Sequence, residues 1–166
     1  MRYVLLKHEN QGDFHIDFLL DCGEERLLTW QISDKSLVNF LIGNEKFFDF
    51  SKSPNSIATT IYSNCRRIID HRRKYLDFSG DLGDDRGYVT CIEHGTWELI
   101  ELNAKQLVLT TVGTRLADNS PMTRQWQFEP PITMTLAPDV TSSERLMQYL
   151  PPPGDGNWIV FCRILC

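Results

Sequence analysis

The second half of the chain is divided into short segments of strand-forming residues, and this pattern restricts the fold more than any other feature. The segments are rich in β-branched or aromatic residues, and Gly, Asn, Asp or Pro stand between them; they are 88–92, 96–99, 107–112, 124–128 and 132–136. Short strands at even spacing with few helices between them favour a closed barrel or a sandwich. We therefore expect a mainly β protein.

The rest of the chain adds strands and a few short helices. Residues 34–42 repeat apolar side chains at helical spacing, and Gly43 is placed to end a helix there. The segment 56–65 is compatible with a second helix or a loop, and Thr141 to Glu144 resembles a capping box that opens a short helix. The remaining strand candidates are 3–7, 15–20, 27–32 and 158–165.

Length and composition indicate one ordinary domain spanning residues 1–166. The net charge of −5 excludes a global attraction to nucleic acid or to anionic membranes, so any affinity for phosphate must come from a local basic patch. The five cysteines are odd in number and show no C-x-x-C spacing, which favours reduced thiols of a cytoplasmic protein. No apolar run is long enough to predict a signal peptide or a membrane span.

The stretch HIDFLL, residues 15–20, has two different faces if it is a strand. His15, Asp17 and Leu19 point one way, and the alternate residues form an apolar face. His8 precedes a loop that contains Gly12 and can fold back toward them. Two imidazoles and a carboxylate are typical ligands of a divalent transition metal. The alternative is a hydrogen-bonded His–Asp pair without a metal, which is a common structural feature.

A basic stretch lies at residues 65–80, CRRIIDHRRKYLDFSG. Its arginines suit phosphate oxygens, which guanidinium groups bind in a two-pronged manner. His71 and Tyr75 are four residues apart and can share one face, so His71 can act as an acid or a phosphate-binding group and Tyr75 as a hydroxyl donor. The alternative is a solvated basic surface. The candidate phosphate-binding residues are Arg66, Arg67, Arg72 and Arg73.

These motifs in this order resemble the 3′-phosphoesterase domain of bacterial DNA ligase D and its stand-alone relatives. The matching pieces are His8, HIDF at 15–18, DHRRKYLDFSG at 70–80, DRGYV at 85–89 and GTWE at 95–98. The resemblance covers about residues 3–128, most closely up to residue 98, and residues 129–166 match nothing in that family.

The resemblance implies a small closed antiparallel β-barrel with short flanking helices, and a manganese-dependent enzyme of DNA repair. Such enzymes remove a terminal ribonucleotide and then the 3′-phosphate from DNA ends. His8, His15 and Asp17 match the metal ligands, for manganese or another divalent transition metal, and His71 and Tyr75 match the residues that engage the scissile phosphate.

One departure from the family pattern affects the expected activity. The ligase-fused enzymes carry an arginine two residues after the aspartate, where this chain has Leu19. The substitution predicts weakened or lost catalysis. Two other functions therefore remain open: a non-catalytic module that binds DNA ends or a repair partner, and a phosphoesterase for a small phosphorylated molecule.

Overall fold

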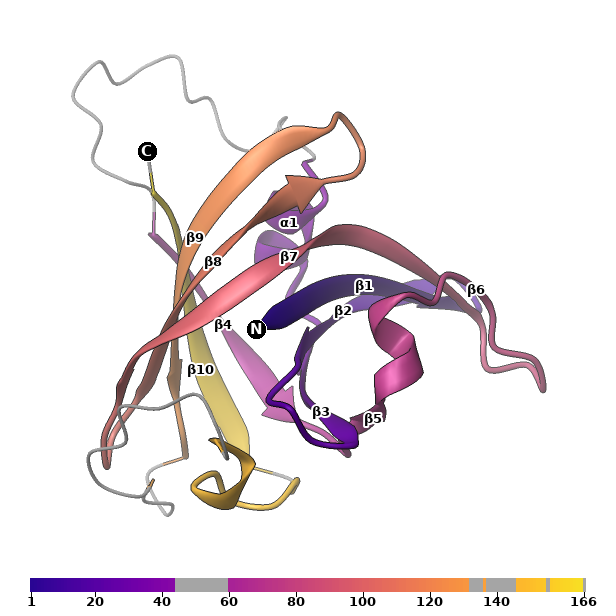
Figure 1. Cartoon of the computed structure of the whole chain (residues 1–166). Helices are drawn as coiled ribbons and strands as arrows, with labels where there is room; N and C mark the ends of the chain where they lie inside the picture. The colour runs from indigo at the N-terminus through magenta and orange to yellow at the C-terminus, as the bar shows by residue number, and fades with distance from the viewer. Residues whose placement is uncertain (44–59, 132–135, 137–145, 155, 166) are drawn as a thin grey trace.

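The structure is a computed structural model of the chain, and it describes residues 1–43, 60–131, 136, 146–154 and 156–165. Within these residues, eight antiparallel strands close into a barrel in the order β1-β2-β3-β4-β10-β9-β8-β7, because β7 also pairs with β1 (Figure 1). The sequence-based prediction of a closed antiparallel β-barrel is confirmed.

Most of the predicted strands are present, and several are longer than the sequence pattern indicated. The eight barrel strands are β1 (Arg2–Asn10), β2 (Asp13–Leu20), β3 (Arg26–Ile32), β4 (Thr60–Arg67), β7 (Tyr88–Leu102), β8 (Leu107–Arg115), β9 (Ser120–Glu129) and β10 (Asn157–Ile164). The predicted strand at 132–136 and the predicted capping box at 141–144 fall on residues outside the described ranges, apart from Leu136.

Two details of the sequence-based prediction are wrong: the break between the strands 88–92 and 96–99, and the helix or loop expected at 56–65. The segments 88–92 and 96–99 belong to one strand, β7, and Gly95 lies inside it. A Cβ at Gly95 would stand 2.1 Å from the carbonyl oxygen of Val112, so the glycine allows β8 to approach closely and forms no turn. The segment 56–65 is neither helix nor loop from Thr60 onward, because β4 begins there.

Short helices flank the barrel, as predicted. α1 (Lys35–Leu41) begins after Asp34, whose side chain accepts hydrogen bonds from the backbone N–H groups of Ser36 and Leu37. Its buried side chains join the barrel core at the upper end in Figure 1. The 3₁₀ helices are η3 (Arg73–Leu76) and η4 (Leu146–Gln148). No helix within the described ranges has the length and apolar character needed to cross a bilayer.

The barrel interior is filled by large aromatic side chains. All four tryptophans are buried, and they are Trp30, Trp97, Trp126 and Trp158. The apolar face of β2 points into this core through Ile16, Phe18 and Leu20. The prediction that alternate residues of this strand form an apolar face is therefore confirmed.

The outer face of β1 and β2 carries a second, smaller core. The segment that covers it contains β5 (His71–Arg72), η3 and β6 (Gly80–Asp81), and η3 lies in front of these strands in Figure 1. Leu19 is fully buried here. The other buried members of this second core are Val4, Leu6, Leu27, Leu76 and Val89. The histidine-bearing face of the sheet is thus partly covered by protein.

Candidate metal centre

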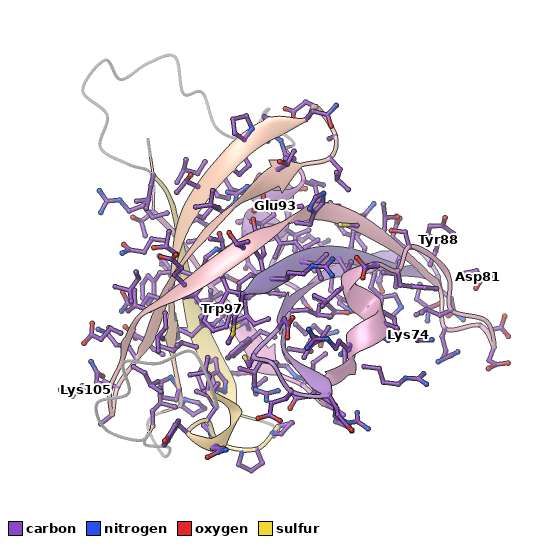
Figure 2. All side chains as sticks on the ribbon, in the orientation of Figure 1. Lys74, Asp81, Tyr88, Glu93, Trp97 and Lys105 are labelled. Carbon is purple, nitrogen blue, oxygen red and sulfur yellow. The ribbon has the colours of Figure 1, made fainter. Side chains whose placement is uncertain are left out.

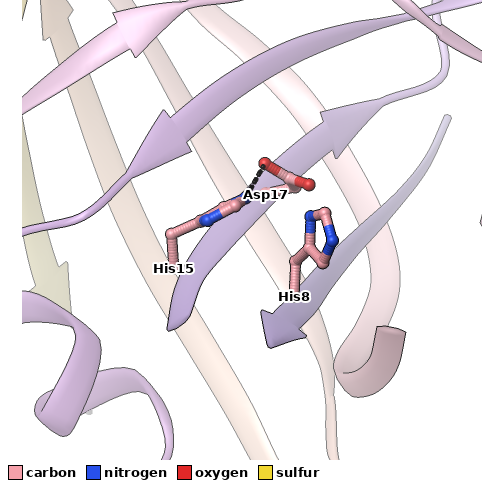
Figure 3. Close-up of side chains that lie close together, drawn as sticks. All are labelled: His8, His15 and Asp17. Carbon is pink, nitrogen blue, oxygen red and sulfur yellow. Dashed lines mark ion pairs between the residues drawn. The ribbon is translucent and has the colours of Figure 1, made fainter. Parts of the chain in front are cut away.

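The three predicted metal ligands converge on the outer face of β1 and β2. A two-residue turn at Gln11 and Gly12, both with positive φ, fixes the hairpin register so that His8 stands directly opposite His15. Asp17 follows two residues later on the same face (Figure 3). One donor atom from each residue lies within 4.8 Å of the others. Two ligands on opposite sides of one ion with bonds of about 2.1 Å are ~4.2 Å apart, so the cluster is close to the size of a metal site.

Asp17 is a buried carboxylate with no lysine or arginine in ion-pair contact among the described residues. Its exposed fraction is 3%, and its Oδ1 has no hydrogen-bond partner there. The nearest groups are imidazoles: His15 Nε2 lies 3.4 Å from Oδ1, and His71 Nε2 lies 3.8 Å from Oδ2. Burial of an unpaired carboxylate is unfavourable by several kcal/mol, so a cation at this position would remove a cost that the fold otherwise carries.

The other ring nitrogens of two histidines contact backbone carbonyls. His8 Nε2 lies 2.7 Å from the carbonyl oxygen of Arg86, and His71 Nδ1 lies 3.2 Å from that of Ile69. A carbonyl oxygen only accepts, so each of these nitrogens donates, and the second nitrogen of the neutral ring keeps a lone pair. Metal-binding histidines are usually held in this manner. For His71 the remaining nitrogen, Nε2, faces the Asp17 carboxylate, 3.8 Å from its Oδ2.

The structure brings His71 to the predicted ligands although it is distant in the sequence. β5 pairs with β3, and the backbone N–H of His71 donates to Thr29 Oγ1 over 3.3 Å. The half-buried Tyr75 packs its ring edge-on against the His71 ring, with 5.2 Å between the centroids. Sequence reasoning did not identify Thr29 or the Arg86 carbonyl as supports of the site. The Asp-Asp-Arg-Gly turn was the only local signal for Arg86.

The four predicted phosphate-binding arginines fall into two groups. Arg67 is buried, forms an ion pair with Asp70 and stacks on Trp30 with 5.4 Å to the ring centroid. Arg73 donates from both terminal nitrogens to the Asp21 carboxylate, at 2.6 Å each.

Arg66 and Arg72 form the second group. Both are exposed, and neither has a carboxylate partner within the described ranges. They are therefore better placed for an external phosphate than Arg67 and Arg73.

His71 also borders a pocket beside the cluster. The pocket has a volume of about 450 Å³, and its lining residues include Arg66, Ile69 and His71 together with Pro153 and Gly154 from the C-terminal segment. The backbone N–H of Gly154 donates to the carbonyl oxygen of Arg67 over 3.4 Å, which fixes that segment at the end of β4. Sequence reasoning assigned no role to residues 129–166, and here two of them border the candidate site.

A second buried carboxylate lies inside the barrel. Glu93 is fully buried on β7, above Trp97 in Figure 2. It accepts from the Tyr3 hydroxyl over 2.7 Å and from Arg124 Nε and an Arg124 terminal nitrogen over 3.2 and 2.9 Å. Burial and the adjacent Glu93 carboxylate raise the pKa of the Tyr3 phenol far above its usual range. The carboxylate is fully paired, and the sequence pattern gave no signal for it.

No protein-family model matches the sequence, and no curated protein matches it. The resemblance to the ligase D phosphoesterase domain therefore stays a prediction that is carried by sequence motifs.

Proposed function

We propose that the chain is a phosphoesterase that acts on 3′ ends of nucleic acid and depends on manganese or another divalent transition metal. One observation carries the proposal: His8, His15 and the buried Asp17 bring their donor atoms together, and Asp17 has no protein cation to pair with in the described ranges. Two imidazoles and one carboxylate suit such an ion. The motif resemblance adds the substrate class.

The residues around the centre suit a phosphate ester. His8, His15 and Asp17 would hold such an ion, which would supply Lewis-acid polarisation of a phosphoryl oxygen. His71, whose Nε2 faces Asp17, is placed to exchange a proton with the ester oxygens or to hold them. The exposed Arg66 and Arg72 provide positive charge, and such charge stabilises the negative charge that builds up in the transition state.

A second function is favoured because two of the four candidate phosphate-binding arginines already form ion pairs within the protein. Leu19 stands where the fused enzymes carry an arginine, and Arg67 and Arg73 already bind carboxylates of the protein itself. A centre with fewer free cations fits a non-catalytic module that binds DNA ends or a repair partner. Under either function, location in the cytoplasm stays a prediction from the reduced cysteines. The four described cysteines, 22, 65, 91 and 162, are free.

The decisive experiment measures manganese binding and phosphate release in parallel. Isothermal titration calorimetry with MnCl₂ is followed by release of inorganic phosphate from a 3′-phosphorylated oligonucleotide. We expect the wild type to bind manganese and to gain about 2.7 kcal/mol of unfolding free energy at a hundredfold excess over Kd. His15→Ala loses both binding and turnover. The matched control is His94→Ala, an exposed histidine of β7 outside the cluster, and it retains both.

The outcomes separate the alternatives. A wild-type protein without measurable affinity for manganese, zinc or cobalt would overturn the metal centre. A protein that binds the metal and the oligonucleotide, yet releases no phosphate and no 3′-ribonucleoside, would be the binding module. Turnover of a small phosphorylated molecule in preference to DNA ends would identify the third function.

A further inference from the structure

An aromatic pair lies on the solvent side of the barrel, where it serves no core. Tyr62 on β4 and Phe161 on β10 are register partners, and their ring centroids are 6.1 Å apart. Tyr62 is 72% exposed, and Phe161 is partly exposed. A cross-strand aromatic pair adds roughly 0.2–1 kcal/mol to the stability of a sheet, and when it is this exposed it is also available to contact a ligand.

Two arginines and one carboxylate, that of Glu129, lie on the outer face around this pair. Arg66 and Asn64 follow Tyr62 on the outer face of β4, and Arg163 follows Phe161 on β10; all three are exposed. Gln127 is the register partner of Phe161 on β9 and donates to Glu129 over 2.7 Å. In a chain with a net charge of −5, two exposed arginines on the same outer face as the tilted aromatic pair provide local positive charge for an anion with planar groups.

The aromatic pair is continuous with the candidate metal centre. Tyr62, Asn64 and Arg66 alternate along β4 with buried residues, so they share the outer face. Four residues of strand place Arg66 about 13 Å from Tyr62. Arg66 lines the pocket of about 450 Å³ that also contains Ile69 and His71, and His71 faces Asp17. A chain-like ligand can therefore extend from the centre through the pocket to the two rings.

We propose that the outer face of β4 and β10 is a platform for single-stranded nucleic acid, with a base stacked on Tyr62 and Phe161 and a phosphate on Arg66. The terminal nucleotide would occupy the pocket beside His71. This inference rests on the proposed function, because the 3′ end is what enters the centre. Aromatic rings interleaved with cations on a β-barrel surface are the general means of binding single strands without sequence preference.

Binding is tested without metal, so that catalysis does not enter the measurement. The probe is an oligothymidylate of about eight nucleotides with a 5′-fluorescein and a 3′-hydroxyl, and fluorescence anisotropy in EDTA gives Kd. Tyr62→Ala and Arg66→Ala are each expected to raise Kd about tenfold, in line with the loss of one stacked base or one phosphate contact. Tyr62→Phe keeps the ring and binds like the wild type. Ile100→Ala, an exposed apolar residue of β7, is the control.

The result that overturns the platform is a Kd for Tyr62→Ala equal to that of Tyr62→Phe and Ile100→Ala. Circular dichroism confirms that each variant is folded, which is expected because Tyr62 is exposed. A second assay separates this failure from that of the proposed function: the wild type with manganese is given a 3′-phosphorylated dinucleotide, which is too short to reach Tyr62. Turnover of the dinucleotide with ring-independent oligonucleotide binding would leave the function and remove the platform. Ring-dependent binding without turnover would leave the platform and remove the function.

Discussion

Two buried carboxylates of this protein have opposite surroundings. Glu93, inside the barrel, is contacted by the Arg124 guanidinium and the Tyr3 hydroxyl, so both of its oxygens are bonded. Asp17, under the second core, has the imidazoles of His15 and His71 as its ion-pair partners among the described residues, and its Oδ1 has no hydrogen-bond partner there. Both carboxylates are within 3% of complete burial.

We infer from this difference that Glu93 is a structural charge and that Asp17 is a candidate for binding a cation. A buried carboxylate that is fully paired holds strands together, and removing either partner leaves the other charge uncompensated. A buried carboxylate without a cation weakens the fold unless a ligand completes it. On this reasoning Glu93 and Asp17 respond to the same chemical change in opposite ways.

The largest expected effect follows when each carboxylate is made neutral. Glu93→Gln leaves the Arg124 guanidinium buried without its counter-charge, and we expect a loss of about 3–5 kcal/mol of unfolding free energy. Asp17→Asn removes an uncompensated charge and is expected to keep or raise stability in metal-free buffer while manganese binding is lost. Urea unfolding of both variants measures the contrast. An Asp17→Asn variant as unstable as Glu93→Gln would make Asp17 a structural residue.

The second-largest effect on stability is expected when a guanidinium is placed beside Asp17, as the Arg124 guanidinium lies beside Glu93. Leu19→Arg introduces a guanidinium on the same strand face, at the position where the ligase-fused enzymes carry it. Leu19 is fully buried among apolar side chains, so we expect a loss of about 3 kcal/mol of unfolding free energy. The new cation competes for Asp17, so manganese affinity falls as well.

Leu19→Met is the control for packing and is expected to cost less than about 1.5 kcal/mol. If Leu19→Arg is as stable as Leu19→Met and binds manganese normally, the second core has room for a guanidinium at position 19, and the variant then tests whether that cation raises turnover.

The smallest effect concerns pH and the hydroxyl that completes the Glu93 pair. Burial, first, and the Glu93 carboxylate hold the pKa of Tyr3 above its unfolded value of 10.0. Below pH 10 this contribution to stability is fully present. Above pH 10 the unfolded chain ionises and the folded chain does not, so stability falls by up to about 1.4 kcal/mol per pH unit. Tyr3→Phe removes this slope, which unfolding free energies between about pH 9 and pH 11 would show.

Buried cysteine thiols also make the unfolding free energy fall with rising pH, and they do so equally in the wild type and in Tyr3→Phe. Burial raises the pKa of Cys22 and of Cys162 from 9.0 to about 12, so their contribution is lost from pH 9 upward. It cancels when Tyr3→Phe is compared with the wild type. Equal slopes for the two proteins above pH 10 would contradict the burial of the Tyr3 phenol against Glu93.

Much of the barrel could be predicted because alternation along a strand is a local property. The two faces of β2 follow from period 2, and the Gly12 turn places His8 opposite His15. β4 could not be recognised, because Ser63 and Asn64 have low strand propensity and the strand is held by its neighbours β3 and β10. Gly95 was interpreted as a turn because nothing local reveals how closely β8 approaches.

The sequence predicted which residue types make up the candidate site, but it did not predict how deeply they are buried. The alternation of side chains along a strand predicted that His15 and Asp17 share a face. The burial of Asp17 depends on the covering segment from residue 71 onward, which that alternation does not reveal. The roles of the arginines depend on carboxylates that are distant in the sequence, such as Asp21 for Arg73. Glu93 and Arg124 are 31 residues apart and lie on different strands, so no local spacing pattern predicts that they pair.

The pairing of β1 on both of its edges has a consequence for the choice of ion. His8 is bracketed by His15 on β2 and Val89 on β7, and Asp17 by Leu6 on β1 and Gln31 on β3. The backbone at His8 and Asp17 is therefore held by a neighbouring strand on each side. A cation site that is built from a loop differs, because the loop can expand or contract around the bound ion. Adjustment to an incoming ion is left to rotation of the imidazole rings. If the cluster binds a metal as proposed, a scaffold of this stiffness would select the ion by radius and coordination angle, so that small differences between divalent metals become differences in fit.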